Sequence, residues 1–257
     1  MSAPCLRRQI KNIYTTLDHT HTLSPTFVNF LTLVVVAVMD AEAATELVER
    51  IYSAPGLDLD AAFDLSEADI KLVNNRAGSN KAVNYGEMCL PSWATVVQHV
   101  GLSSADVFYD LGSGRGTLVL HTQLMHRLQK CVGVELSAER HSMASRALQA
   151  LRQQQPQSAA AVTFLHADIR ECDLSDATCC FLMNQDMPHK LIAAVWTKLL
   201  AIEQPCTVIT LHAPRDIRAA DLPPRETLSG LPQTWNAAVD VLVYRLPGAA
   251  ACRKRVF

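Results

Sequence analysis

VFYDLGSGRGTLVLHTQLMHRLQKCVGVE, residues 107–135, is the stretch that decides the fold of this chain. Residues 107–111 form a short apolar run with β-branched and aromatic side chains, which is typical of a buried strand. Three glycines follow at alternate positions, and residues 117–128 then place apolar side chains at helical spacing. A second apolar run, residues 131–134, ends at Glu135. The stretch therefore predicts a strand, a glycine-rich turn, a helix and a second strand.

The glycine-rich turn predicts a site for a nucleoside cofactor. Gly112, Gly114 and Gly116 allow a ligand to approach the backbone where a Cβ atom would block it. The free N–H groups at the start of the following helix can face a negative group. Glu135 ends the second strand, where a carboxylate can accept hydrogen bonds from ribose hydroxyls.

The spacing of the glycines indicates which cofactor binds. A dinucleotide site uses G-x-G-x-x-G, whereas here the third glycine comes one residue earlier and Asp110 precedes the first glycine by two positions. An acid at that position would repel a pyrophosphate, but it suits a ligand that carries an ammonium and a sulfonium group. The pattern D-x-G-x-G-x-G resembles motif I of the class I S-adenosylmethionine (AdoMet) methyltransferases, so AdoMet is the expected cofactor. An NAD site and a degenerate site are the alternatives.

Composition narrows the class of protein. The chain has 257 residues, of which 49% are apolar, so it can form one sizeable core or one domain with an appendage. Its formal net charge is −2, so any contact with nucleic acid must come from a local basic patch. Its eight cysteines include no CxxC pair, so we expect no metal site and a reduced intracellular compartment.

Residues 1–75 are expected to form a mostly helical N-terminal region, followed by a catalytic domain at 76–257. The apolar segment Phe27–Met39 is too short for a membrane helix, and a signal sequence is the alternative to a long buried helix that runs to Ile51 with a break near Asp40. Ser66 and Asp69 resemble a capping box.

Two further N-terminal features have alternative interpretations. His19 and His21 have a spacing that can bind metal, although no other ligands cluster nearby and a solvated terminus is the simpler interpretation. Residues 74–84 have the composition of a loop, and Tyr85 to Met88 could close over the cofactor.

Strands alternate with helices through the rest of the chain. This order predicts an α/β fold with a Rossmann-like, doubly wound sheet that ends in a late antiparallel strand. Ligands bind such sheets at the carboxyl ends of the strands. The expected strands after Glu135 are 162–165, 178–183, 206–211 and 238–246, and residues 223–232 are expected to be irregular with at most a short strand.

Polar residues follow the third and fourth expected strands. Asp168 can accept a hydrogen bond from an adenine amino group while Ile169 packs on the ring, or Asp168 can cap a short helix. Asn184 follows the fourth strand, where its side-chain oxygen could orient a nitrogen nucleophile.

A lysine substrate must lose its proton before it can accept a methyl group. At a pKa of about 10.4, this deprotonation costs about 4.6 kcal/mol at pH 7, and an apolar channel lowers the cost. Met183, Met187, Pro188 and Trp235 could line such a channel, or they could be ordinary packing.

Several motifs occur together in one order: Tyr85-Gly86-Glu87, then residues 108–117, then Gly133-Val-Glu135, then Asp168 and Asn184. In this respect residues 73–246 resemble the disruptor-of-telomeric-silencing family, the non-SET histone H3 lysine methyltransferases, and especially its kinetoplastid-type members. The resemblance implies AdoMet binding, a lysine channel in which Asn184 and Tyr85 are catalytic, a nucleosomal substrate and a nuclear location. The implied cofactor-binding residues are Tyr85, Gly86, Glu87, Met88, Phe108, Asp110, Gly112, Ser113, Gly114, Gly116, Thr117, Glu135, Asp168 and Ile169.

The chain departs from the family pattern at three places. An Asn-Asn pair is common after strand four, where this chain has Met183-Asn184-Gln185. In the family a tyrosine a few residues past a tryptophan lines the channel. After Trp235 the nearest tyrosine of this chain is Tyr244, and Leu242 could occupy the place instead. The long basic segment is absent, so contact with nucleosomes and a weak contact with DNA would depend on local basic residues. These are Arg76, Lys81, Arg215, Arg218 and Arg253 to Arg255.

Two other functions compete with histone methylation. The first is an AdoMet enzyme that acts on a non-histone protein, an RNA or a small molecule. The second is a catalytically silent binding module that keeps the fold.

Overall fold

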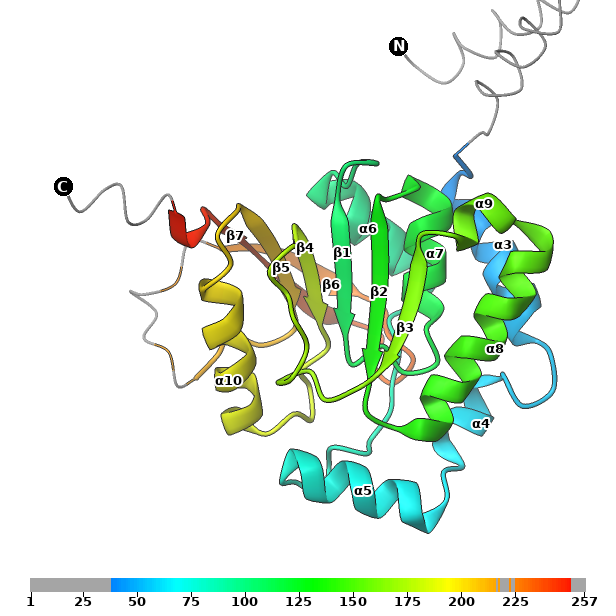
Figure 1. The fold of residues 1–257 in the computed structure, drawn as a ribbon, viewed down its shortest axis with the longest axis horizontal. Helices are drawn as coiled ribbons and strands as arrows, with labels where there is room; N and C mark the ends of the chain where they lie inside the picture. Colours follow the sequence, from blue (N-terminus) through cyan, green and yellow to red (C-terminus); the bar gives the residue numbers. More distant parts are fainter. Residues whose placement is uncertain (1–37, 216, 218–221, 223–224, 251–257) are drawn as a thin grey trace, which may run out of the picture. The chain divides into compact units, whose positions relative to one another are not determined.

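The computed structural model describes residues 38–215, 217, 222 and 225–250. Within this part the chain forms one seven-stranded sheet with helices on both faces (Figure 1). The order of the strands across the sheet is β3-β2-β1-β4-β5-β7-β6. Their bounds are β1 Val107–Leu111, β2 Lys130–Glu135, β3 Val162–His166, β4 Cys179–Leu182, β5 Cys206–Thr210, β6 Arg225–Leu231 and β7 Val239–Leu246.

The pairing of the strands identifies the fold class. β1 to β5 pair in parallel, whereas β7 runs antiparallel to both β5 and β6. The order reverses at β1, which has β2 on one side and β4 on the other, and this is the switch point where ligands bind in doubly wound sheets. The predicted Rossmann-like class I methyltransferase fold, with its late antiparallel strand, is confirmed.

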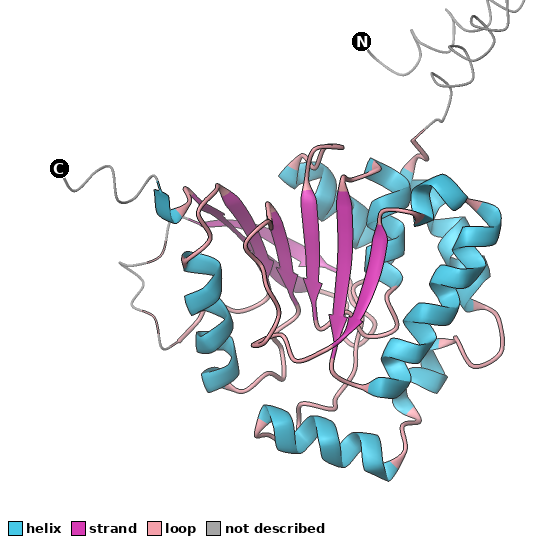
Figure 2. Cartoon of the chain, in the orientation of Figure 1, coloured by secondary structure: helices cyan, strands magenta, loops and turns pink. Residues whose placement is uncertain are grey.

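Eight helices of the described residues surround the sheet (Figure 2). Alternate residues of the central strands point to opposite faces, so that Phe108 belongs to one apolar core and Tyr109 to the other. α3, α6, α7 and α8 contribute to the first core and α10 to the second, which explains why these strands are apolar throughout. The helices are α3 Ala41–Tyr52, α4 Leu59–Phe63, α5 Glu67–Ala77, α6 Leu90–Val100, α7 Thr117–His126, α8 Ala138–Gln154, α9 Pro156–Ala159 and α10 His189–Leu200.

The N-terminal helices begin at side chains that cap them. Asp40 caps α3, which begins at Ala41, and the part of the expected long helix before residue 38 lies outside the described residues, so the break near Asp40 stays a prediction. Ser66 accepts a hydrogen bond from the backbone N–H of Asp69, as the predicted capping box requires. α3 packs against α6, α7 and α8. The boundary at residue 75 stays a prediction, because the first 37 residues are not described.

Two expectations about secondary structure are wrong. The loop expected from residue 74 begins later, because α5 continues to Ala77 and ends at the left-handed Gly78. The segment expected to be irregular contains the seven-residue strand β6, which pairs with β7. No helix of the described residues has the length and apolarity that a membrane span needs.

Candidate functional site

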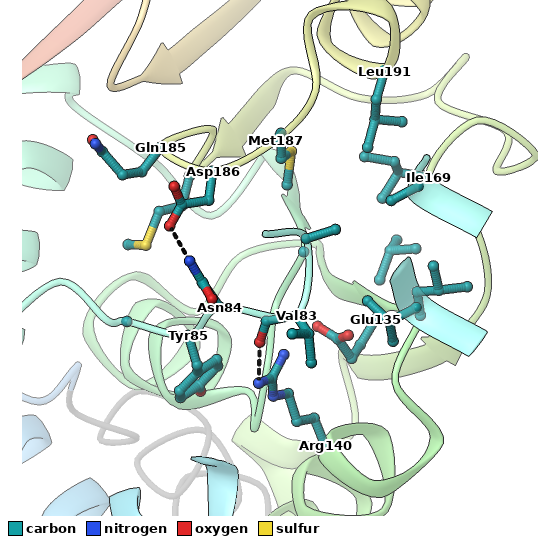
Figure 3. A pocket seen from close by; sticks show the side chains of 18 of the residues that line it. Val83, Asn84, Tyr85, Glu135, Arg140, Ile169, Gln185, Asp186, Met187 and Leu191 are labelled. Atoms are coloured by element: carbon teal, nitrogen blue, oxygen red, sulfur yellow. Dashed lines mark hydrogen bonds between the residues drawn. The ribbon is translucent and has the colours of Figure 1, made fainter. Parts of the chain in front are cut away.

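A cavity of about 560 Å³ opens at the carboxyl ends of the strands (Figure 3). α5 lies across these ends in Figure 1 and contributes Ile70, Val73 and Ala77 to the cavity wall. Six of the residues predicted to bind the cofactor line the cavity, and their contact with a ligand stays a prediction. They are Tyr85, Gly86, Gly112, Glu135, Asp168 and Ile169.

The glycine bend is shaped for the protein's own side chains as well as for a ligand. Gly112, Gly114 and Gly116 all have positive φ, at 99°, 55° and 88°. A Cβ atom on Gly114 would lie 2.5 Å from the Tyr85 hydroxyl oxygen, and a Cβ atom on Gly116 would overlap the ring of Phe164. Only Gly112 among the three lines the cavity. Gly114 and Gly116 therefore serve packing behind the bend, where the sequence analysis had placed them on the ligand.

Glu87 joins the segment before α6 to the glycine bend. Its carboxylate accepts two hydrogen bonds from the Arg115 guanidinium, at 2.7 and 2.8 Å, and one from the Thr117 hydroxyl at 2.8 Å. The Tyr85 hydroxyl also donates to Glu87, at 2.5 Å. These bonds fix the Tyr85-Gly86-Glu87 strap on the bend, and they use the oxygens of Glu87. Glu87 and Thr117 do not line the cavity and hold the bend from behind, so their predicted contact with the cofactor stays a prediction.

Arg115 is a functional residue that the sequence analysis missed. Its Nη1 atom donates to the Leu57 carbonyl oxygen at 2.7 Å, and its own carbonyl oxygen accepts from the Tyr52 hydroxyl at 2.5 Å. The guanidinium lies 4.7 Å from the centre of the Tyr52 ring. Arg115 is 8% exposed, and its bonds with Glu87 raise its pKa despite burial. The sequence did contain a signal for this role. Arg115 stands between two glycines of the bend, and a buried cation needs a partner of opposite charge.

Glu135 is positioned by two backbone groups. Its Oε2 atom accepts from the N–H of Gly114 at 2.8 Å, and its Oε1 atom accepts from the N–H of Ser137 at 2.8 Å. A carboxylate has about four acceptor positions, so two remain. Because Glu135 lines the cavity, these positions can accept hydroxyl groups of a ribose.

Asp168 sits on the cavity wall and is held by arginine side chains. Arg170 donates to both of its oxygens, and Arg76 lies 3.6 Å from Oδ2. Burial alone would raise the pKa of Asp168, but these hydrogen bonds and charges lower it below its ordinary value. The backbone N–H of Arg170 also bonds to Asp168 Oδ1 at 2.9 Å, so the carboxylate shapes the local turn without capping a helix.

Asp110 and Ser113 carry buried polar atoms without partners. Asp110 is 2% exposed, and neither its Oδ1 atom nor the Ser113 hydroxyl oxygen has a hydrogen-bond partner among the described residues. Burial, followed by the charges of Glu135 and Glu87, raises the pKa of Asp110 well above its ordinary value. Neither residue lines the cavity, so a ligand would relieve this cost only if its positive charge reached Asp110 through the bend. The acidic, side-chain-poor bend therefore fits AdoMet, whose ammonium and sulfonium groups are cationic.

Met88, Phe108 and Asn184 are buried outside the cavity wall, and their predicted roles stay predictions. Met88 and Phe108 are core residues, 1% and 0% exposed. Asn184 is 1% exposed, and its oxygen accepts from the backbone N–H groups of Leu211 and His212 at 3.2 and 2.9 Å. Its nitrogen donates to the His212 carbonyl oxygen, so the amide connects the end of β4 to the segment after β5. Asn184 does not line the cavity. The predicted orientation of a nucleophile by this amide stays a prediction, and the bonds of the amide to the segment after β5 give it no support.

The wall of the cavity after β4 is lined by methionines and polar side chains. Met183, Met187 and Trp235 line it as predicted, and Met187 lies against Gly112. Pro188 instead caps α10, and both Leu242 and Tyr244 belong to the core beside α10. The sequence analysis missed Asn84, Gln185 and Asp186, which also line this side.

The structural comparisons give weak similarities. An RNA methyltransferase from Salinibacter ruber in complex with S-adenosyl-L-homocysteine is 21% identical over 61% of this chain and 91% of its own, with a TM-score of 0.44. TYW2 of M. jannaschii in complex with AdoMet is 11% identical over 72% of this chain and 78% of its own, also with a TM-score of 0.44. At these values neither similarity carries an argument, and the fold class rests on the strand order. No curated protein matches the chain.

The family comparison is more extensive. The family described as "Histone methylation protein DOT1" matches residues 65–220, which is more than half of the chain. The match begins before α5 and includes the strap, the glycine bend and the cavity wall as far as the end of β5. The chain belongs to the DOT1 family of histone methylation proteins and is a methyltransferase whose cofactor is S-adenosylmethionine.

Proposed function

We propose that the protein is a nuclear lysine N-methyltransferase that acts on the core of nucleosomal histone H3. Family membership supports this proposal, together with one observation that carries it. A single cavity is lined by the acidic side chains Glu135 and Asp168 and by the apolar side chains Met183, Met187 and Trp235. The acidic side chains suit adenosine, and the apolar ones suit the uncharged form of a lysine amine.

The acidic side chains and their neighbours bind and orient the cofactor. When bound, AdoMet supplies a methyl group on a sulfonium sulfur. The nucleophile would take the methyl group from the side opposite the sulfur, and the sulfur would leave as a thioether. Glu135 offers two free acceptor positions for ribose hydroxyls, and Ile169 offers an apolar surface beside Asp168 for the adenine ring. Tyr85, held at its hydroxyl by Glu87, covers the bend and excludes water. Positioning of this kind can account for much of the catalysis of a displacement reaction.

The apolar side chains favour the neutral amine. Loss of the lysine proton costs about 4.6 kcal/mol at pH 7 for a pKa of about 10.4. Met183, Met187 and Trp235 lower this cost because apolar surroundings disfavour an ammonium ion. Trp235 is 40% exposed, so it lies where the cavity meets solvent and can contact the stem of an entering side chain.

Contact with the nucleosome rests on fewer basic residues than the sequence analysis assumed. Arg76 is engaged with Glu171 at 2.5 Å and with Asp168, so its charge is partly neutralised. Lys81 and Arg215 are exposed, while Arg218 and residues 253–255 lie outside the described residues. We therefore expect a DNA contact to be weak and sensitive to salt.

The test is methyl transfer from labelled AdoMet to nucleosomes, free histones and total RNA in parallel. The proposal predicts label on histone H3 of nucleosomes, at a lysine that mass spectrometry can locate. The matched control is Gly112→Arg, which would fill the cavity beside Met187 and should remove the label. Label confined to RNA would contradict the proposal and favour the competing substrate class. No transfer together with no heat of AdoMet binding would favour a silent binding module.

A further inference from the structure

A hydrogen bond connects Asn84, the residue before the strap, to the segment after β4 at one side of the cavity (Figure 3). The Asn84 side-chain nitrogen donates to Asp186 Oδ2 at 3.0 Å, and both residues line the cavity. In Figure 3 this pair lies on the opposite side of the cavity from Ile169 and Leu191. It is therefore on the substrate side of the cavity, if Ile169 marks the position of adenine.

Asp186 differs from the other two acids of the cavity wall in its partners. Glu135 accepts from two backbone N–H groups, and Asp168 is paired with the guanidinium of Arg170. No arginine, lysine or histidine of the described residues forms an ion pair with Asp186, whose partner is the uncharged amide of Asn84. None of the described basic residues thus balances its negative charge.

The surroundings of Asp186 suit the side chain of a lysine. The neighbouring Met187 lines the same cavity, and its Cε atom would lie 3.1 Å from a Cβ atom on Gly112. Met183 and Trp235 line the same cavity and provide apolar surface for a methylene chain. An acid at the rim of an apolar channel can therefore bind an ammonium group before it enters the channel.

We propose that Asp186 is the specificity residue that receives the protonated amine of the substrate, and that the amine replaces Asn84 as its partner. This inference rests on the proposed function and names the substrate as a primary alkylammonium rather than a neutral nucleobase or a hydroxyl compound. Release of Asn84 couples entry of the substrate to the strap that carries Tyr85. Asp186 acts in binding: the ammonium gives its proton to solvent water at the rim, and the neutral amine then enters among the apolar side chains.

A binding experiment tests the inference without relying on catalysis. Trp93 and Trp196 are fully buried and Trp235 is partly exposed, so we expect Trp235 to report on ligands at the rim. The protein loaded with S-adenosylhomocysteine is titrated with n-butylammonium and with the uncharged n-butanol, and tryptophan emission is followed. The inference predicts that the cation binds at least tenfold more tightly, since a hydrogen bond to a charged group is worth that much. Asp186→Asn should remove the difference, and Asp186→Glu should retain most of it.

Steady-state kinetics with nucleosomes provide the second measurement. Asp186→Asn should raise KM about tenfold or more while kcat falls less than threefold and the affinity for S-adenosylhomocysteine is unchanged. The matched control is Asp240→Asn, which removes one exposed carboxylate of β7 that is outside the cavity wall.

Three results would overturn the inference. They are equal binding of the two probes to the native protein, an unchanged KM in Asp186→Asn, and an equal loss in Asp240→Asn. If the native protein distinguishes the probes but does not methylate nucleosomes, the histone proposal fails and the alkylammonium site stands. If it methylates nucleosomes and Asp186→Asn behaves like the native protein, the inference fails and the proposed function stands.

Discussion

At the scale of single residues, Asp110 is expected to strengthen the binding of AdoMet and to lower the stability of the cofactor-free protein. Burial and the charges of Glu135 and Glu87 raise its pKa, so the free protein favours the protonated acid. A raised pKa means that stability is present at low pH and is lost as the pH rises through the folded-state pKa. Since asparagine does not titrate, Asp110→Asn should make the cofactor-free protein more stable than the native protein at alkaline pH.

The same substitution should weaken binding of AdoMet at least tenfold, because it removes a charged partner worth roughly 1.5–3 kcal/mol. Denaturant unfolding between pH 5 and 9 and calorimetry with AdoMet measure the two effects. The same pH dependence of stability in both proteins, together with unchanged affinity, would show that Asp110 is not the acid that faces the cation.

Glu135 allows the contribution of the ribose contact to be separated from that of the backbone contacts. Glu135→Ala leaves the N–H groups of Gly114 and Ser137 without their partner, so it should lower both stability and AdoMet affinity. Glu135→Gln keeps an oxygen acceptor and the side-chain volume. We expect Glu135→Gln to weaken AdoMet binding by at most roughly 3 kcal/mol and to lower stability less than Glu135→Ala does. Calorimetry on both variants checks this, and unchanged affinity in Glu135→Ala would refute the assignment to ribose.

At the scale of elements, the strap, the glycine bend and α3 are joined by one buried ion pair. Arg115 and Glu87 are 8% and 9% exposed, and Tyr52 of α3 packs on the guanidinium. Removing one partner of such a pair leaves a buried charge, so Arg115→Met should lower the free energy of unfolding by about 3–5 kcal/mol. The double variant with Glu87→Met should recover part of that loss.

Urea denaturation of the single and double variants measures the coupling between Arg115 and Glu87. Arg50→Met is the control, since the Arg50 side chain donates an exposed hydrogen bond to Gln154 and its loss should cost less than about 1 kcal/mol. Equal losses in Arg50→Met and Arg115→Met would mean that the ion pair does not hold the strap.

The contact between α3 and α7 predicts sensitivity to acid. His121 of α7 is fully buried beside Thr45 of α3, and burial lowers its pKa from 6.5 to about 4. A lowered pKa contributes stability that is present above the unfolded value, near 6.5, and is lost as the pH falls toward 4. The difference corresponds to roughly 3 kcal/mol at 1.36 kcal/mol per pKa unit.

Thermal unfolding between pH 4 and 7.5 measures this loss of stability. His121→Gln should show a shallower fall than the native protein, whereas His189→Gln, which removes an exposed imidazole, should not. If the unfolding temperature fell equally with pH in all three proteins, burial of His121 would not be the cause of the acid sensitivity.

At the scale of the whole molecule, local patterns predicted the elements wherever burial was strong. β1 and β2 were predicted to within one residue because apolar runs bounded by glycine and polar residues have few other interpretations. β6 was expected only as a possible short strand, because its residues are mostly exposed; it carries no hydrophobic pattern and depends on pairing with β7. Tertiary pairing of this kind is not encoded in the local sequence.

The candidate site was predicted in position but not in the direction of its side chains. The strand ends correctly placed Glu135 and Asp168 on the cavity, because the topology brings these ends together. Asn184 is also at a strand end, but its amide bonds to the segment after β5, which no local pattern reveals. Arg115 was overlooked for the same reason, since its partners Glu87 and Leu57 are distant in the sequence.

The central claim concerns the whole cavity: its acidic side chains hold adenosine and its methionines face the substrate. A crystal structure with S-adenosylhomocysteine tests this most directly. The claim predicts ribose hydroxyls at Glu135, the adenine ring at Ile169, and the sulfur atom toward Met187 and Asp186. An adenine ring at Asp186, or a ligand bound outside this cavity, would contradict it.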